Sequence, residues 1–379
     1  MIPSERLVAA GGALTFAFIG AVQALYGPLL PAFRSSFAID AGTAGLVFAV
    51  HGAGSLCGIL APGVLRSRPL ARHGLAVATT LLFIGAAGLA LAPTWPWLLA
   101  AAFVFALGFG VHVVRLNELF VTGFGAGGMA MSQLINCAFS VGTILGPLAL
   151  AAVADPSPRL FGLVATLALA LLPASVLIER TAPRMAVAST ERSPVLAEAK
   201  DSWRRLAAFM AIMCLVGGVE NSIGGWTATL ALAAGYAYRD AANLTALFFG
   251  AILAGRLAAV GLAQRVPAGR LVTGSLAGIA VFVAGAVFTS AGVIALALTG
   301  LAVAPIFAAT LVWLGAALPH SRHAGAVVIA ASLLGSGMFP ALVGRVIERF
   351  GEAAAPPAIL MLAVAALVVA LRLPPVPGG

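Results

Sequence analysis

Polar residues interrupt this sequence only at intervals, and twelve long apolar stretches run between them. We place the stretches at 6–32, 40–64, 72–92, 95–121, 127–153, 159–178, 205–233, 241–263, 270–290, 292–317, 324–346 and 354–372. An α-helix needs about 20 apolar residues to cross a hydrocarbon core of about 30 Å. The first stretch is too long for a signal peptide and lacks a clean small-residue cleavage site, so we count it as a helix. The pattern predicts an all-α integral membrane protein with twelve transmembrane helices.

The amino-acid composition also indicates that the protein lies in lipid. The chain is 61% hydrophobic and 9% charged, whereas soluble domains have about 45–50% apolar and about 25% charged residues. The net charge of +9 is unevenly placed, because fourteen of the 21 basic residues fall in loops and tails on the side of the N-terminus. Such an asymmetry marks the cytoplasmic side. We therefore expect a multi-pass protein of a bacterial cytoplasmic membrane, with both termini cytoplasmic, in contact with lipid and not with nucleic acid.

The segment 179–204 is the only long polar stretch. It predicts a cytoplasmic linker between a six-helix bundle at 1–178 and a second six-helix bundle at 205–379. Internal repetition supports this division. "GAVQALYG" at 20–27 matches "GGVENSIG" at 217–224 at an offset of 197 residues. At this offset or one slightly smaller, the paired residues are Gly20 with Gly217, Gln23 with Glu220, Gly58 with Gly255, and Pro147 with Pro340. The two bundles are therefore expected to be pseudo-symmetric.

Twelve spans in two parallel halves around a charged central loop resemble the major facilitator superfamily. Local motifs resemble its fucose permease and glucose/galactose branch: "YGPLLPAF", "GVENSIGGW", "FGAILAGRL", "APIFAATL" and "GSGMFPALVGRVIERFG". The resemblance implies a carrier of small solutes. Gly27 and Val113 stand where fucose permease has acidic residues, and "GILAPGVLRSRPLAR" lacks the acidic residue of the superfamily's loop signature. Proton coupling is then expected at Glu220 or Glu118, and a hexose becomes a less suitable substrate.

Glu220 is the strongest candidate for a functional residue. A charged side chain at the bilayer centre costs about 2.5–3.5 kcal/mol on insertion scales, so its presence in a span calls for a reason. A carboxyl group in a medium of low dielectric constant can exchange a proton near neutral pH. We expect the surrounding glycines to let the helix at 205–233 bend, with Asn221 and Trp226 facing the solute. The alternative is that Glu220 pairs permanently with Arg256 and the glycines only allow close helix packing.

Other polar residues within the spans complete the predicted site. Arg115 and Glu118 are three positions apart, so they share a helix face and are expected to act as a gate. Glu118 is also a second candidate for proton coupling. His51 and His112 are either relays or metal ligands, or hydrogen-bonded packing residues. The residues expected to bind the solute are Gln23, Tyr26, Asn117, Gln133, Asn136, Asn221, Trp226 and Arg256.

These residues favour a secondary active transporter, proton-coupled and monomeric, that moves a small polar or amphipathic organic solute by alternating access. One alternative is a drug:proton antiporter, for which "GTILGP" at 142–147 is a weak hint. Another is a metal or metal-chelate carrier that uses Met210, Met213 and Cys214, although methionines in apolar helices usually serve packing. No nucleotide-binding signature or nucleophile constellation is present. We therefore expect no enzymatic activity, no cofactor and no bound metal.

Overall fold

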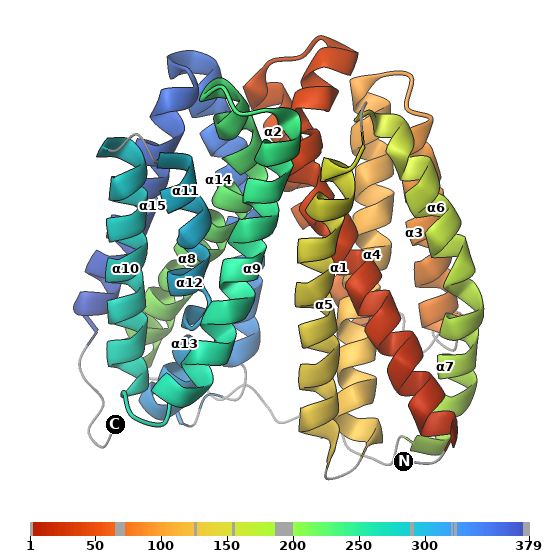
Figure 1. Ribbon diagram of the computed structural model, residues 1–379. Coiled ribbons are helices and arrows are strands. Elements are labelled where there is room, and N and C mark those ends of the chain that lie inside the picture. Colours follow the sequence, from red (N-terminus) through yellow and green to blue (C-terminus); the bar gives the residue numbers. More distant parts are fainter. Residues whose placement is uncertain are drawn as a thin grey trace. The chain divides into compact units, whose positions relative to one another are not determined.

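The computed structural model describes residues 3–64, 73–124, 127–153, 156–185, 200–288, 292–319, 321 and 324–373. These residues form helices joined by short turns, without a strand among them (Figure 1). The helices are α1 (Pro3–Phe37), α2 (Ala41–Val64), α3 (Gly74–Ala90), α4 (Trp95–Gly123), α5 (Gly128–Ala151), η3 (Pro158–Leu160), α6 (Phe161–Ala170), α7 (Leu172–Met185), α8 (Lys200–Ala233), α9 (Tyr238–Leu262), α10 (Ala268–Phe288), α11 (Gly292–Leu298), α12 (Gly300–Val303), α13 (Ile306–Ala317), α14 (Ala324–Phe350), η4 (Glu352–Ala354) and α15 (Ala355–Leu371).

Eleven of the predicted spans coincide with helical segments that are long and apolar enough to cross a membrane. The remaining span, expected at 72–92, is α3, an apolar helix of 17 residues. The prediction of an all-helical, multi-pass membrane protein is therefore confirmed for the residues that the structure describes. Two predicted spans are not single helices: 159–178 is divided into α6 and α7, and 292–317 into α11, α12 and α13.

Proline explains one of the interruptions in 292–317. Pro305 lies between α12 and α13 and has no backbone N–H, so it cannot donate to the carbonyl of Leu301 four residues earlier. That carbonyl oxygen lies against α9 at Gly255, where an added Cβ would come within 2.6 Å of it. The glycine therefore lets α9 pass close to the broken segment. Broken helices at membrane depth occur where the backbone is buried in protein or lines a cavity.

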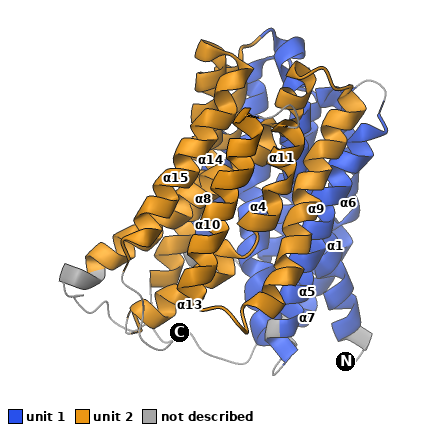
Figure 2. Cartoon of the chain, turned by 60° about the vertical axis from the view of Figure 1, so that its left-hand side comes forward, with its two compact units in different colours: residues 1–38, 50–192 blue, residues 39–49, 193–379 orange. Residues whose placement is uncertain are grey.

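The chain divides into two compact units, coloured separately in Figure 2. Unit 1 comprises residues 1–38 and 50–192, and unit 2 comprises residues 39–49 and 193–379. The boundary at 192 falls inside the predicted linker, but both ends of that linker are helical, since α7 continues to Met185 and α8 begins at Lys200. Long charged side chains are good helix formers, so the helices extend beyond their apolar parts. Residues 186–199 lie outside the described ranges.

The start of α2 belongs to unit 2, although the sequence predicted all of it in the first bundle. Gly45 lies against α14, where an added Cβ would be 3.2 Å from the Cα of Ala341, and the ring of Phe48 packs 6.4 Å from that of Trp226. The N–H of Thr43 donates to Asp40 at 2.6 Å, which lowers the pKa of this carboxyl below its usual value. Small residues and an aromatic pair thus join the beginning of α2 to unit 2.

The glycines of α8 serve packing. An added Cβ at Gly217 would be 2.5 Å from the carbonyl oxygen of Ser332 in α14, and one at Gly225 would be 2.6 Å from the ring of Phe48. Gly218 faces Phe339 of α14, and Gly224 faces Phe249 of α9. Meanwhile α8 runs without a break from Lys200 to Ala233. The helix is therefore not interrupted at these glycines, where small residues let neighbouring backbones approach. The expected bend stays a prediction.

The paired glycines of the sequence repeat take matching places in the two units. In unit 1, Gly20 of α1 faces the carbonyl oxygen of Phe139 in α5. In unit 2, Gly217 of α8 faces the carbonyl oxygen of Ser332 in α14. The reverse contact is also repeated, since Gly142 of α5 faces the backbone of Ala17 and Gly335 of α14 faces the backbone of Cys214. Corresponding residues are 197 positions apart on α1 and α8 and 193 positions apart on α5 and α14.

Candidate functional site

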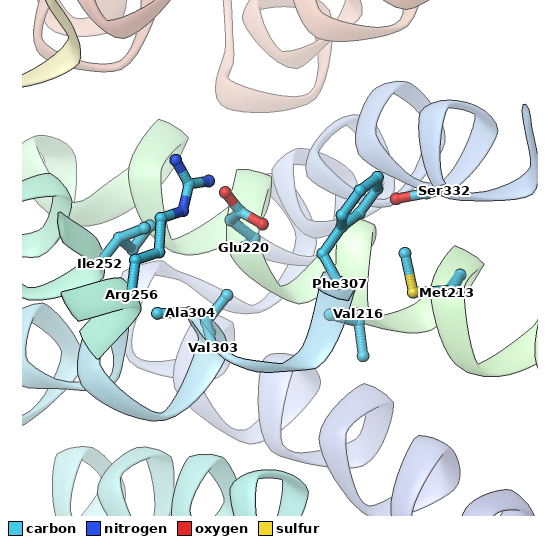
Figure 3. A pocket seen from close by; sticks show the side chains of 9 residues that line it. All are labelled: Met213, Val216, Glu220, Ile252, Arg256, Val303, Ala304, Phe307 and Ser332. Atoms are coloured by element: carbon cyan, nitrogen blue, oxygen red, sulfur yellow. The ribbon is translucent and has the colours of Figure 1, made fainter. Parts of the chain in front are cut away.

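Glu220 of α8 and Arg256 of α9 line one cavity within unit 2 (Figure 3). The cavity has a volume of about 20 Å³, which is room for about one water molecule. The other lining residues come from α8, α9, the broken segment after α11, and α14: Met213, Val216, Ile252, Val303, Ala304, Phe307 and Ser332. The lining of this cavity, though not its volume, resembles that of a small-molecule site, since it is mainly apolar with a few convergent polar groups.

Close helix contacts position the two charged residues. Glu220 lies three residues after Gly217, whose contact with Ser332 brings α8 against α14. Arg256 directly follows Gly255, whose contact with Leu301 brings α9 against the broken segment. The turn at Ala304 and Pro305 then contributes an apolar wall to the same cavity. A close helix contact therefore lies within one turn of Glu220 on α8 and within one residue of Arg256 on α9.

The electrostatics of the cavity depend on these two groups. Figure 3 shows the guanidinium of Arg256 beside the carboxylate of Glu220, with both side chains directed toward the same space. Among the described residues that line the cavity, only Ser332 adds a side-chain hydroxyl, and the other side chains are apolar. Charges attract more strongly where the effective dielectric constant is low. Since arginine keeps its proton and glutamate can gain one, protonation of Glu220 would change its attraction to Arg256 and to any bound solute.

Two predicted solute-binding residues of α8 lie elsewhere. Asn221 donates from Nδ2 to the carbonyl of Gly217 in its own helix, at 3.1 Å. Trp226 is fully buried, and its Nε1–H donates to the carbonyl of Pro340 in α14 at 2.9 Å. Neither residue lines the cavity of Glu220. The environment of Trp226 is that of a packing residue between α8, α14 and the start of α2.

In unit 1 the structure brings Asn117 and Asn136 together. Oδ1 of Asn117 in α4 accepts hydrogen bonds from Nδ2 of Asn136 at 3.1 Å and from Ser132 at 3.0 Å, both in α5. Gln133, the third predicted solute-binding residue in this region, is exposed on α5. The three predicted residues thus occupy one part of α4 and α5, and two of them are bonded to each other.

Arg115 and Glu118 form the predicted pair, but a weak one. Their closest nitrogen and oxygen atoms are 3.9 Å apart, and the side chains are 36% and 54% exposed. Ion pairs of this kind contribute about 0–1 kcal/mol. The contact can therefore form and break at small cost in free energy.

Glu179 of α7 belongs to the same region, and the sequence analysis missed it as a site residue. Its carboxylate accepts hydrogen bonds from the backbone N–H groups of Leu75 and Ala76 at the start of α3. Arg115 and His73 lie close enough to act on it electrostatically. A carboxylate is favoured at a helix N-terminus, where backbone N–H groups have no partner in the helix. The only sequence signal was an acidic residue at the end of an apolar span, and nothing in the sequence specifies which helix start it would reach.

We expect Glu179→Ala to lower the stability of the protein by about 1–2 kcal/mol, because it removes a charged acceptor from the start of α3. Glu179→Gln keeps an acceptor and should lose less. Thr181→Ala is a matched control, since this half-buried residue on the same helix bonds only to Leu177 of its own helix among the described contacts. Thermal unfolding of the purified variants measures the effect. Equal midpoints for Glu179→Ala and Thr181→Ala would show that the contact contributes nothing.

The two buried histidines of unit 1 differ. His112 is fully hydrogen-bonded, with Nδ1 2.9 Å from the carbonyl of Gly108 and Nε2 3.1 Å from Thr79, which in turn bonds Ser175 at 2.6 Å. This chain joins α4, α3 and α7 and fits a packing role. His51 of α2 is also buried, and neither of its ring nitrogens has a hydrogen-bond partner in the described part of the chain.

Comparison with family models matches residues 12–293 to the Major Facilitator Superfamily. The curated proteins give no match. Among solved structures, a bacterial homologue of the human lysosomal transporter Spinster, inward-facing and unoccupied, matches with a TM-score of 0.73 at 15% identity, over 98% of this chain and 95% of that one. The inward-open xylose transporter XylE from E. coli matches with a TM-score of 0.71 at 14% identity, over 100% and 98% of the chains. FucP in its outward conformation matches with a TM-score of 0.61 at 18% identity, over 98% of each chain.

Proposed function

Because the chain belongs to the Major Facilitator Superfamily, whose members carry small-molecule solutes, we propose that it is a proton-coupled secondary active transporter for a small polar or amphipathic organic solute. It is a transporter and not an enzyme. Twelve spans, eleven of them long apolar helical segments and the twelfth the shorter helix α3, would form two pseudo-symmetric repeats with both termini in the cytoplasm. Alternating access would expose the binding site to one side of the membrane at a time.

The observation that carries this proposal is the presence of Glu220 and Arg256 in one apolar cavity of unit 2. A titratable anion beside a permanent cation supplies both a proton carrier and a means to couple its charge to solute binding. Arg256 and Ser332 are the proposed solute contacts in unit 2. Asn117, Gln133 and Asn136 stay predicted contacts in unit 1, and Arg115 with Glu118 a predicted gate.

The structure gives no specific support to the exporter alternative. Gly142 and Gly146 of "GTILGP" lie against the backbone of Ala17 and Ala21 in α1, so close packing explains both glycines. For the metal-carrier alternative, Met213 was one of the candidate ligands. In unit 2 it contributes an apolar side chain to the wall of the Glu220 cavity.

Reconstitution tests the proposed function. A thermal-shift screen of the purified protein against a metabolite library should identify solutes that stabilise the folded state. In proteoliposomes, such a solute should exchange by counterflow and accumulate when a pH gradient is imposed, and a protonophore should abolish the accumulation but not the counterflow. Counterflow that proceeds while the pH gradient has no effect would overturn proton coupling.

A further inference from the structure

Unit 1 contains a cluster of buried polar groups that have no hydrogen-bond partner among the residues that the structure describes. The cluster consists of Gln23 and Tyr26 on α1 and of His51 and Ser55 on α2. Tyr26, His51 and Ser55 are 1%, 8% and 3% exposed. In the part of the chain that the structure describes, nine buried side-chain polar atoms lack a partner, and five of them belong to these four residues. The other four atoms belong to four separate residues, so the concentration here is specific to this place.

Helix geometry places Gln23 and Ser55 next to a contact between Tyr26 and His51. The rings of Tyr26 and His51 meet edge to face, with their centroids 5.1 Å apart. Gln23 lies one turn before Tyr26 and Ser55 lies one turn after His51, so each pair shares a helix face. Since α1 and α2 are consecutive helices joined by a short turn, they run in opposite directions. Gln23 and Ser55 therefore lie on the same side of the contact between Tyr26 and His51.

Aromatic rings surround the polar groups. The ring of His51 lies 5.3 Å from that of Phe109 and 6.4 Å from that of Phe105, and the ring of Tyr26 lies 6.0 Å from that of Phe161. Thus the rings that pack against His51 and Tyr26 offer no counter-charge. The cluster itself presents one amide oxygen, two hydroxyls and an imidazole, which together both donate and accept hydrogen bonds. Such groups match an uncharged partner that also donates and accepts.

Leaving these atoms unpaired is costly. A buried donor or acceptor without a partner has lost the hydrogen bonds that water would give it. Placing a polar side chain in a membrane helix also costs free energy, so such residues commonly serve a function. A ligand that supplies the missing partners would recover this free energy, which makes the cluster suited to binding.

The sequence repeat relates residues of this cluster to residues of the Glu220 cavity. Gln23 of α1 corresponds to Glu220 of α8, and Ser55 of α2 corresponds to Ile252 of α9, which lines the cavity of Glu220. Of these two positions, only that of Gln23 is polar in both units, uncharged in unit 1 and charged in unit 2.

We propose that Gln23, Tyr26, His51 and Ser55 form a binding site for the hydroxyl group of an uncharged, hydroxyl-bearing solute. The site rests on the proposed transport function and specifies the chemistry of one part of the solute. His51 and Ser55 are the residues that this assignment adds to the predicted set.

Cysteine chemistry at position 55 tests the site. The experiment uses the full chain with Cys57, Cys137 and Cys214 replaced by serine, into which Ser55→Cys is introduced as a near-isosteric probe. The neutral reagent methyl methanethiosulfonate should modify this thiol at least tenfold faster than the charged sulfonatoethyl and trimethylammonioethyl reagents. Xylitol, an uncharged polyol, should slow the neutral reaction, and its charged oxidation product xylonate should not.

Two further variants separate binding from folding. Tyr26→Phe should weaken the protection by xylitol about tenfold, because it removes one hydroxyl and keeps the ring. Ser222→Ala, which removes a buried unpartnered hydroxyl in unit 2, should leave the protection unchanged. Size-exclusion profiles of each variant report whether it is folded.

An inert thiol, equal rates for neutral and charged reagents, or a reaction that xylitol does not slow would each overturn the proposed site. The last of these outcomes would mean that water alone occupies the cluster. Transport in proteoliposomes is measured separately on the unmodified protein. Transport with any of these three outcomes removes the site and keeps the function, whereas the expected labelling pattern without transport of any solute removes the proposed function.

Discussion

Glu220→Gln should abolish uphill transport while the protein still folds, binds its solute and exchanges it across the membrane. Glutamine keeps the size of the side chain and much of its hydrogen bonding, but it cannot gain or lose a proton. Without that change in charge, solute movement is no longer linked to the proton gradient. Counterflow and pH-driven uptake in proteoliposomes measure the two properties separately, and we expect the first near the wild-type rate and the second at background.

Two further variants sharpen this test. Glu220→Asp keeps the carboxyl on a shorter side chain and should retain partial uptake with a shifted pH dependence. Ser332→Ala is the matched control, because Ser332 lines the same cavity but carries no charge. It should retain uptake driven by the pH gradient.

A permanent pair between Glu220 and Arg256 predicts a different result. Glutamine would then leave the guanidinium without its counter-charge, and breaking a buried pair costs about 3–5 kcal/mol. Expression and thermal stability of Glu220→Gln would fall together, whatever the solute. A stable Glu220→Gln protein that still concentrates its solute against a gradient would remove Glu220 from the coupling mechanism.

Gly335→Ala should prevent unit 2 from packing, although it adds only one methyl group. The new Cβ would overlap the backbone of Cys214 in α8, and a backbone cannot move aside as a side chain can. Overpacking typically costs about 1–3 kcal/mol, and we expect this contact between two backbones to reach or exceed the upper end. Yield of monodisperse protein and its thermal midpoint measure the effect.

Gly250→Ala is the control for this prediction. Gly250 lies in the middle of α9, and an added Cβ there meets nothing within 4 Å. Alanine also favours a helix over glycine by about 1 kcal/mol, so this variant should be as stable as the wild type or more so. A Gly335→Ala protein with a wild-type midpoint would show that α8 and α14 do not pack as described.

The candidate site was predictable in part. Glu220 and Arg256 were identified because charged residues inside apolar spans are costly and therefore conspicuous. The sequence analysis offered a pair between Glu220 and Arg256 only as an alternative. The structure places both side chains in one cavity. Trp226, by contrast, was expected to face the solute, but its contact with Pro340 depends on α14, more than a hundred residues away in the sequence.

The lipid environment, the helical class and the approximate position of the spans follow from the sequence, because a lipid-embedded backbone must bond internally and an apolar run of sufficient length can do so only as a helix. Tertiary structure alone decided what each residue in a span contacts. Lipid and neighbouring helices are equally apolar, so hydropathy does not distinguish the face of Gly335 that meets Cys214 from one that meets lipid. For the same reason, the partners of Glu179 and the contact between Tyr26 and His51 became visible only where the helices come together.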